Sequence, residues 1–242
     1  MNAIEIKNLT KCYGETVAVN NLTLNVKHGE LFALLGVNGA GKTTTVKTLA
    51  CLTKPTEGDA FLLGKSVTFN SSEVKSFIAL SPQETAIAPA LTVKENLELI
   101  CGLYGLKKQE MLQKIECVAL KLGLEGVLNK KSSKLSGGWK RRLSIAMALI
   151  SDPKILFLDE PTLGLDVIVR SELWDIIRAL KGKVTVILTT HYMEEAEALA
   201  DRVGIMKEGK LLICDTVENI KEFAKTNSFE QAFINIVKGE IK

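Results

Sequence analysis

The chain has 242 residues, of which 46% are hydrophobic and 24% are charged, a composition typical of a folded globular protein rather than a disordered one. Its formal net charge of +3 is nearly balanced, so we expect no nucleic-acid partner, which usually requires a clustered basic surface. The five cysteines include no Cys-x-x-Cys pair, which argues against a zinc site and favours reduced, buried thiols.

The N-terminal part of the chain has the pattern of β-strands. Apolar and polar residues alternate in residues 3–9, 17–26 and 59–67, and glycine, asparagine and proline separate these segments. Residues 91–122 change to a helical pattern with one apolar face. We expect that face to comprise Met111, Leu112, Ile115, Val118, Ala119 and Leu122.

The C-terminal half alternates helical segments with short strands that are apolar throughout. These strands occupy residues 154–160, 183–190 and 202–209. Strands of this kind belong in a parallel sheet whose two faces are both covered. The tail from about residue 216 is again helical, so the sequence predicts an α/β protein.

A glycine-rich loop follows the apolar strand at residues 31–35. Gly36, Gly41, Lys42 and Thr43 fit the pattern Gly-x-x-x-x-Gly-Lys-Thr, and a helix follows directly. Glycines allow backbone N–H groups to surround a phosphate, while Lys42 reaches its outer oxygens and the Thr43 hydroxyl holds Mg²⁺. The strand–loop–helix setting therefore predicts a nucleotide-phosphate site.

Two adjacent carboxylates end the buried strand at residues 154–160. Asp159 suits a water-mediated contact with Mg²⁺, and Glu160 is placed to polarise a water that attacks the terminal phosphate. Solvated acidic residues are common at strand ends. The phosphate loop requires a carboxylate partner, however, which favours the functional interpretation.

Residues 135–142, LSGGWKRR, place a serine and two glycines immediately before an apolar helical run. Ser136 stands where it would cap that helix. Small residues at a helix start also expose backbone N–H groups to an anion.

These motifs together resemble the nucleotide-binding domain of the ATP-binding cassette (ABC) ATPases over about residues 2–215, in the family's order. LSGGW is similar to the family signature, normally Leu-Ser-Gly-Gly-Gln, and residues 161–166, PTLGLD, are similar to its D-loop. The resemblance implies a P-loop NTPase (RecA-like) core with an N-terminal antiparallel β subdomain and an inserted α-helical subdomain. It implies one nucleotide-binding domain over residues 1–242, with the helical subdomain at about 84–140 and a short helical extension at about 216–242.

The resemblance also assigns roles to individual residues. The catalytic set is Glu160, His191, Gln83 and Lys42. The Mg²⁺ set is Thr43, Gln83 and, through water, Asp159. The ATP-binding set is Tyr13 on the adenine, Gly36, Asn38, Gly39, Ala40, Gly41, Lys42, Thr43 and Thr44 on the phosphates, and Ser136, Gly137, Gly138 and Asp166 on the ATP of a neighbouring chain.

The sequence departs from the family pattern at two positions. Trp139 replaces the usual signature glutamine, and Leu163 takes a position commonly held by a small residue. Neither change removes a catalytic group, so both bear on geometry and rate rather than on activity itself.

The implied cofactors are ATP and Mg²⁺, and the implied partners are a second copy or a related ATPase subunit and a separate transmembrane permease subunit. Such a protein would lie at the cytoplasmic face of the membrane, bound through the permease. Residues 91–106, 189–211 and 228–236 resemble the exporter branch that handles drugs, lipids, polysaccharides or sodium.

Two other classes remain open. A non-transport ABC protein of translation or DNA repair usually carries two cassettes or a long coiled-coil insertion, and the short segment between Gln83 and Ser136 leaves no room for one. A GTPase or nucleotide kinase would share only the phosphate loop. Residues 129–132, Asn-Lys-Lys-Ser, lack the aspartate of the guanine-reading Asn-Lys-x-Asp motif.

Overall fold

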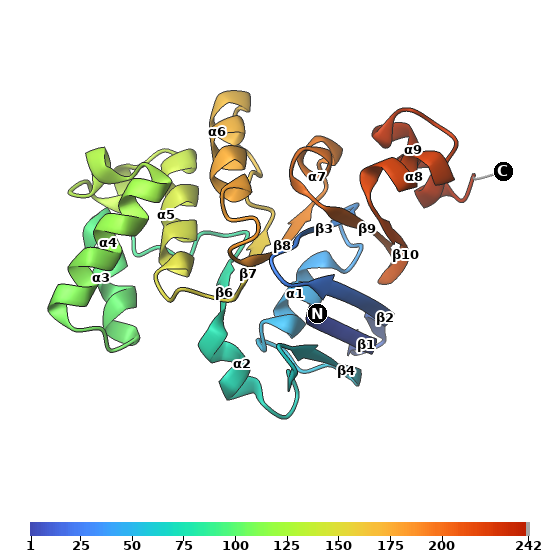
Figure 1. The fold of residues 1–242 in the computed structure, drawn as a ribbon, viewed down its shortest axis with the longest axis horizontal. Coiled ribbons are helices and arrows are strands. Elements are labelled where there is room, and N and C mark those ends of the chain that lie inside the picture. Colours follow the sequence, from blue (N-terminus) through green and yellow to red (C-terminus); the bar gives the residue numbers. More distant parts are fainter. Residues whose placement is uncertain (241–242) are drawn as a thin grey trace.

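The computed structural model describes residues 1–240, which form two β-sheets flanked by helices (Figure 1). The first sheet is antiparallel, with the strand order β2-β1-β4-β5. Its strands are β1 (Asn2–Tyr13), β2 (Thr16–Lys27), β4 (Glu57–Leu62) and β5 (Lys65–Ser66). The predicted β-rich N-terminal part is confirmed.

The second sheet has the order β10-β9-β3-β8-β7-β6, and all its neighbouring strands are parallel except the antiparallel pair β9–β10. Its strands are β3 (Leu31–Gly36), β6 (Ile78–Ser81), β7 (Ile155–Asp159), β8 (Thr185–Thr190), β9 (Arg202–Lys207) and β10 (Lys210–Asp215). The sequence pattern missed β6 and β10, because four residues are too few to show a period and β10 is only half buried.

Two hydrophobic cores lie on opposite faces of the parallel sheet. On β3, Phe32 and Leu34 pack into the core shared with the antiparallel sheet, while Leu31, Ala33 and Leu35 pack into the core beneath the other helices. Because successive strand residues point to opposite faces, a strand covered on both sides must be apolar throughout. This explains why no polar residue interrupts β3.

The helices differ in how they cover the sheets. Figure 1 shows α3, α4 and α5 grouped at one end of the molecule and α8 and α9 at the other end. The helices are α1 (Lys42–Leu49), α2 (Ser71–Phe77), α3 (Val93–Leu103), α4 (Lys108–Leu122), α5 (Gly137–Leu149), α6 (Val167–Arg178), α7 (Met193–Leu199), α8 (Val217–Phe223) and α9 (Phe229–Lys238), with short 3₁₀ turns at Glu125–Val127 and Ser132–Lys134. The expected C-terminal extension runs to residue 242, and its last two residues lie outside the described part.

The predicted helical stretch at residues 91–122 is two helices, because the chain turns between α3 and α4 at Gly105, whose φ is 69°. The α3 helix starts with a capping box between Thr92 and Glu95. The apolar face predicted for α4 is wrong at Leu112, which is 45% exposed. The later residues Ile115, Val118, Ala119 and Leu122 are buried as expected.

The expectation of buried cysteines is also mostly wrong. Cys101 is buried, Cys117 is exposed and the other three are half-buried, and all five are free thiols. Small thiols fit at a half-covered surface as well as in a core, so cysteine content alone does not predict burial. Within residues 1–240, no helix has the length and apolarity needed to cross a membrane.

The fully buried Phe157 of β7 tests the packing between the two sheets. Phe157→Ala leaves a cavity behind the strand that carries Glu160, so we expect it to lower the free energy of unfolding by about 3–5 kcal/mol. Chemical denaturation measures the loss. The matched control is Phe69→Ala, because Phe69 is 85% exposed and its loss should cost less than about 0.5 kcal/mol. Equal losses for the two variants would contradict this packing.

Candidate active site

The site lies at the carboxyl ends of three adjacent parallel strands, where open α/β sheets bind their ligands. In the sheet, β8 stands between β3 and β7, and the register pairs Leu35 with Thr190 and Asp159 with Thr189. Consequently the loop after β3, Glu160 after β7 and His191 after β8 meet at one edge.

Steric limits fix the glycines at both ends of the phosphate loop. A Cβ on Gly36 would lie 2.5 Å from the Met206 carbonyl oxygen, and one on Gly41 would lie 2.4 Å from the Ala18 carbonyl oxygen. Gly41 also has φ of 101°, which side chains disfavour, and α1 begins at the next residue, Lys42. The loop therefore holds its shape against β9 and β2.

Lys42 connects the loop to the carboxylate on β7. Its Nζ donates to the carbonyl oxygens of Gly36 at 2.8 Å and Val37 at 3.3 Å. The same Nζ lies 3.3 Å from Glu160 Oε1, and both side chains are almost fully buried. A buried cation of this kind requires anionic partners, which favours phosphate binding in the loop.

Glu160 is held from its other side by His191. Its Oε2 lies 2.5 Å from His191 Nδ1, and its backbone N–H donates to the Thr189 carbonyl at 3.1 Å. Glu160 has φ of 49°, a conformation that non-glycine residues seldom adopt and that is concentrated at functional sites. A carboxylate fixed between a cation and an imidazole is equipped to orient and polarise a water molecule.

Asp159 and Thr43 bring oxygen ligands together beside Lys42. Asp159 Oδ1 accepts hydrogen bonds from Thr43 Oγ1 at 3.1 Å and from Thr189 Oγ1 at 2.5 Å. Mg²⁺ prefers carboxylate, hydroxyl and phosphate oxygens. The donor set therefore fits the ion that the sequence predicts.

A cavity of about 630 Å³ opens over these groups. Its lining includes residues 38–44, Gln83 and Glu160 from the predicted set. It also includes Thr16, Val17, Ala18 and Glu208, which sequence reasoning missed because these residues belong to no motif.

Tyr13 does not line this cavity. It ends β1 with 48% of its surface exposed, and Lys11 Nζ lies 4.9 Å from its ring centroid. Val17 is the larger of the two apolar side chains of β2 that border the cavity, the other being Ala18, and it is 44% exposed. The contact between Tyr13 and adenine therefore stays a prediction. Val17 is a second candidate for contact with the adenine ring.

The signature residues lie apart from the phosphate loop. Gly137, Gln83 and Leu163 line part of a second cavity of about 410 Å³, which we call the signature cavity. No residue of the phosphate loop lines it. Ser136 occupies the N-cap position of α5, but its side chain makes no capping hydrogen bond, so that part of the prediction is wrong. Because Ser136 is exposed, water can satisfy the first amides of α5 instead.

Gly138 has a packing role in addition to the predicted one. A Cβ there would lie 2.5 Å from Val169 Cγ1, so the glycine lets α5 approach α6 closely. Trp139, the departure from the family pattern, is half-buried against the core, and the Arg142 guanidinium lies 5.2 Å from its ring centroid. Trp139 is therefore a packing residue in this structure.

Asp166 has a local structural role as well. Its carboxylate accepts hydrogen bonds from the backbone N–H groups of Ile168 and Val169, both at 3.0 Å, and so caps α6. Leu163, the second departure, lies in the turn before this cap and is 37% exposed.

Comparison with known proteins decides the family. Residues 19–163 match the model of the family described as ABC transporter. The chain belongs to the ABC transporter family. The match spans the phosphate loop, the signature and both carboxylates of this cassette.

Relatives of the cassette are longer proteins. The cassette is 38% identical over 240 residues to the probable multidrug ABC transporter ATP-binding protein YbhF of Escherichia coli, covering 97% of the cassette and 41% of that protein. It is 40% identical over 223 residues to the human phospholipid-transporting ATPase ABCA3, covering 90% of the cassette and 13% of that protein. The chain therefore spans less than half the length of these relatives.

Solved structures give the same fold. An ATP-binding subunit of an ABC transporter superposes with a TM-score of 0.86 at 27% identity, covering 97% of the cassette and 99% of that chain. The ATP-binding cassette MJ0796, a dimer bound to ADP and Pi, superposes with a TM-score of 0.80 at 29% identity, covering 88% and 98%. The predicted α/β fold class is confirmed.

A buried carboxyl group behind the site escaped sequence reasoning. Glu195 on α7 is fully buried, and its Oε1 accepts hydrogen bonds from Thr162 Oγ1 at 2.8 Å and Trp174 Nε1 at 3.1 Å. Its Oε2 forms no hydrogen bond of ordinary geometry within residues 1–240, although the Thr190 hydroxyl lies near the carboxyl group. Burial raises the pKa of Glu195, and the hydrogen bonds from its neighbours offset only part of that effect.

The raised pKa predicts a pH-dependent stability. Native Glu195 holds its proton more tightly than the unfolded chain does, so its stabilising effect is complete below the unfolded pKa and is lost as pH rises through the folded pKa. Glu195→Gln keeps an acceptor for Thr162 and Trp174 but cannot ionise. We expect its Tm relative to the parent protein to rise between pH 4 and pH 8, by about 2–4 °C for each kcal/mol relieved.

The control for this test is Glu197→Gln, because Glu197 lies on the same helix, is exposed and pairs with Lys221. This variant should show no gain in Tm at high pH. A Tm difference between Glu195→Gln and the parent protein that stays constant with pH would contradict the burial argument.

Proposed function

We propose that this cassette binds Mg²⁺–ATP, hydrolyses it to ADP and phosphate, and thereby powers a membrane transporter. The observation that carries the proposal is the buried Glu160 carboxylate, held between Lys42 at 3.3 Å and His191 at 2.5 Å beside a phosphate loop. A carboxylate at the surface is solvated by water and does not require two buried partners of this kind. The cavity above it is of a size that suits a nucleotide.

In this proposal, the backbone N–H groups of residues 38–44 and the Lys42 ammonium hold the phosphates, helped by the positive end of α1. Thr43, Gln83 and, through water, Asp159 hold Mg²⁺, which neutralises charge on the phosphates when bound. The exposed aromatic Tyr13 and the apolar Val17 contact the adenine. We expect Mg²⁺–ATP turnover with little base selectivity, because ring stacking on Tyr13 and apolar contact with Val17 are open to any base.

Glu160 accepts a proton from, or polarises, the attacking water, while His191 fixes the carboxylate orientation through its 2.5 Å contact. Gln83 borders both the cavity over the phosphate loop and the signature cavity, so its side chain can respond to a ligand in either one. Hydrogen bonds that fix these side chains lower the barrier to hydrolysis chiefly by positioning the attacking water and by stabilising the charge that develops on the phosphate.

The position of the signature supports a composite site between two chains. Ser136 and Gly137 are exposed, and they lie outside the cavity of their own phosphate loop. We propose that they close on the terminal phosphate of ATP held by a second copy or a related subunit, and that Asp166 faces that same neighbour. The dimeric structure of MJ0796 with ADP and Pi supports such an arrangement.

Removal of the Glu160 carboxylate tests the hydrolytic proposal. Glu160→Gln keeps the size of the side chain but loses the base, so kcat for ATP should fall by about 10²–10⁴-fold. The variant should still bind ATP, measured by equilibrium titration. Glu218→Gln, an exposed residue at the start of α8, is the control and should match the parent rate. Full activity in Glu160→Gln would refute the role of this carboxylate.

The same variant tests the two-chain site. With hydrolysis blocked, Mg²⁺–ATP should convert Glu160→Gln from monomer to dimer in analytical ultracentrifugation, since the bound nucleotide lies between the chains. Adding Ser136→Ala should weaken that dimer while leaving nucleotide binding to each chain in place. A monomer with and without ATP would contradict the composite site.

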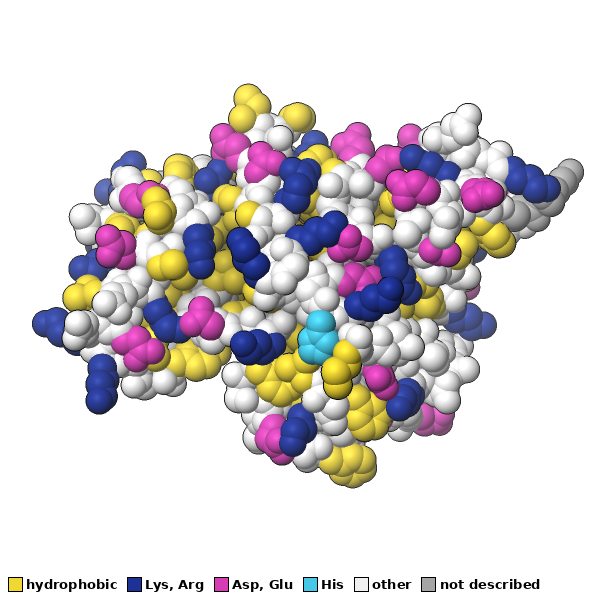
Figure 2. All heavy atoms as spheres, viewed as in Figure 1, with side chains coloured by type: hydrophobic (Ala, Val, Ile, Leu, Met, Phe, Trp, Pro, Cys, Tyr) yellow, Lys and Arg dark blue, Asp and Glu magenta, His cyan; other side chains and the backbone are white. Residues whose placement is uncertain are grey.

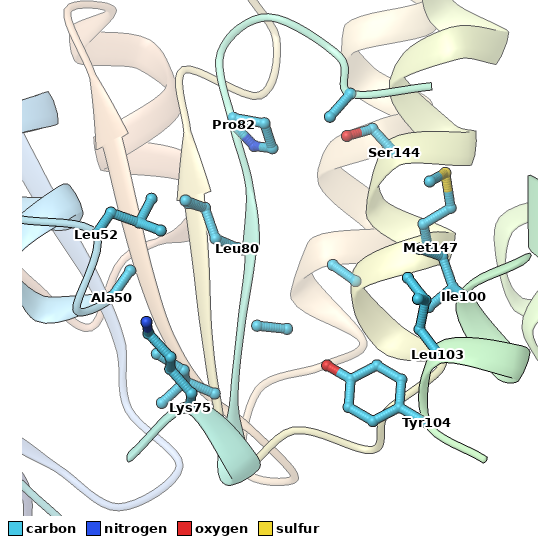
Figure 3. A pocket seen from close by; sticks show the side chains of 14 residues that line it. Ala50, Leu52, Lys75, Leu80, Pro82, Ile100, Leu103, Tyr104, Ser144 and Met147 are labelled. Carbon is cyan, nitrogen blue, oxygen red and sulfur yellow. The ribbon is translucent and has the colours of Figure 1, made fainter. Parts of the chain in front are cut away.

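A separate apolar groove supports a membrane partner. The groove encloses about 430 Å³ beside β6, and it is lined in part by Leu52, Leu80, Leu103, Tyr104 and Met147. In Figure 3, Leu52 and Leu80 lie on one side and face Met147, Leu103 and Tyr104 across the gap. We propose that a cytoplasmic helix of a separate permease docks here, next to Gln83.

Three large apolar groove residues are exposed in the single chain, namely Leu103 at 75%, Leu52 at 61% and Tyr104 at 49%. Exposed apolar side chains beside a concave surface are typical of a binding site. In contrast, Figure 2 shows basic and acidic side chains interspersed over the face in view. The names of the relatives, a multidrug transporter protein and a phospholipid transporter, support export as the direction of transport.

Charge placed in the groove should break the docking. The double variant Leu52→Asp, Leu103→Asp should no longer recover a multi-span membrane protein when the tagged chain is purified from solubilised membranes of its own cells. Leu120→Asp on α4 is the control, because Leu120 is 68% exposed and lies outside the groove. Unchanged Tm shows that both proteins are folded. Equal recovery with both variants would rule out the groove as the docking surface.

A further inference from the structure

Arg141 is a buried cation in a helix whose adjacent basic residues are not fully buried. It lies in the second turn of α5 and is 5% exposed, whereas its neighbours Lys140 and Arg142 are half-buried. Arg142 pairs with Glu172, while Arg141 forms no ion pair with any of residues 1–240. Burying a cation without such a pair is costly, so its hydrogen bonds and the nearby carboxylates of Asp159, Glu195 and Glu160 must offset the loss of water.

Those hydrogen bonds run to three backbone carbonyls in two separate segments. Nη1 donates to the Pro82 carbonyl at 2.7 Å, and Nη2 donates to the Gln83 carbonyl at 2.7 Å and to the Glu160 carbonyl at 3.3 Å. The planar fork of a guanidinium can serve such divergent acceptors at once, and a lysine ammonium on its flexible stem cannot do so with the same geometry. One side chain therefore joins α5, the Gln83 loop and the Glu160 turn.

The contact with Glu160 acts on the backbone that aims its carboxylate. Glu160 has φ of 49°, its amide donates to Thr189, and its carbonyl accepts from the Leu163 N–H at 3.2 Å and from Arg141 at 3.3 Å. A residue held on both sides of its Cα cannot relax into a more common conformation. The carboxylate is therefore kept between Lys42 and His191.

The contact with the Gln83 loop adds a second restraint. Of the three carbonyls that Arg141 binds, those of Pro82 and Gln83 lie in this loop, and Gln83 and Arg141 both line the signature cavity with Gly137. A further hydrogen bond joins the same elements, between Ser144 of α5 and Ser81 at the end of β6. The helix that begins at the signature, α5, is thus connected to both the Gln83 loop and the Glu160 turn.

We propose that Arg141 is a positioning residue for ATP hydrolysis, which holds the Glu160 turn and the Gln83 loop in register with the signature helix. The proposal rests on the proposed ATPase function. Arg141 contacts no reacting atom, so its loss should reduce the rate of the chemical step and leave nucleotide binding intact.

The test compares Arg141→Lys and Arg141→Gln with the parent protein. Lysine keeps the charge without the fork, and glutamine removes the charge, so neither variant can hold all three carbonyls. For both we expect kcat for ATP hydrolysis to fall at least tenfold, with KM and the Kd for ATP within about threefold of the parent values. A general loss of folded protein would also lower the apparent kcat at unchanged KM, so kcat is expressed per ATP-binding site counted in the equilibrium titration, and folding is checked by Tm.

Arg142→Lys is the matched control, since it changes the adjacent arginine and leaves the three carbonyl contacts of Arg141 in place. Its kcat should stay within twofold of the parent value. The proposal is overturned if Arg141→Lys retains parental kcat, if Arg142→Lys loses as much, or if the effect falls on KM. It is also overturned if neither Arg141 variant folds, because Arg141 is then a structural requirement.

The two proposals fail in different ways. An inactive parent protein would refute the ATPase function itself. An active parent whose activity depends on Glu160 but not on Arg141 would refute only the positioning role.

Discussion

The site depends on one buried interaction, the contact of the Glu160 carboxylate with Lys42 on one side and His191 on the other. Three charged or titratable groups are costly to desolvate, and the arrangement persists only if each is held by further hydrogen bonds. The phosphate-loop carbonyls hold Lys42, and Thr189 and Arg141 hold the backbone of Glu160. The positions of these three side chains are therefore set by contacts along the whole sheet edge.

The fold supplies that edge in two steps. The parallel order places β8 between β3 and β7, so three strand ends deliver their residues to one place. The antiparallel sheet then closes over the loop, and the Ala18 carbonyl leaves room only for a glycine at position 41. Packing and chemistry are therefore coupled, because a larger residue at this point would displace the phosphate loop.

Sequence predicted well what is local along the chain. The residues around Gly36–Thr43 and Asp159–Glu160 lie in contiguous motifs, and the apolar strands that carry them are unambiguous because both faces are buried. It failed where the determining contact is distant. Arg141 reads as one of three basic residues in a row, and Glu195 as one of several acidic residues, until the fold buries them. Likewise nothing in the sequence shows that the Ser136 hydroxyl would stay free of its own helix.

A structure of Glu160→Gln with Mg²⁺ and ATP tests the proposed site most directly. We expect a head-to-tail pair of chains, with the terminal phosphate against Lys42 of one chain and Ser136 of the other, and a water between that phosphate and residue 160. A nucleotide bound away from Lys42, or a phosphate with no water path to residue 160, would contradict it.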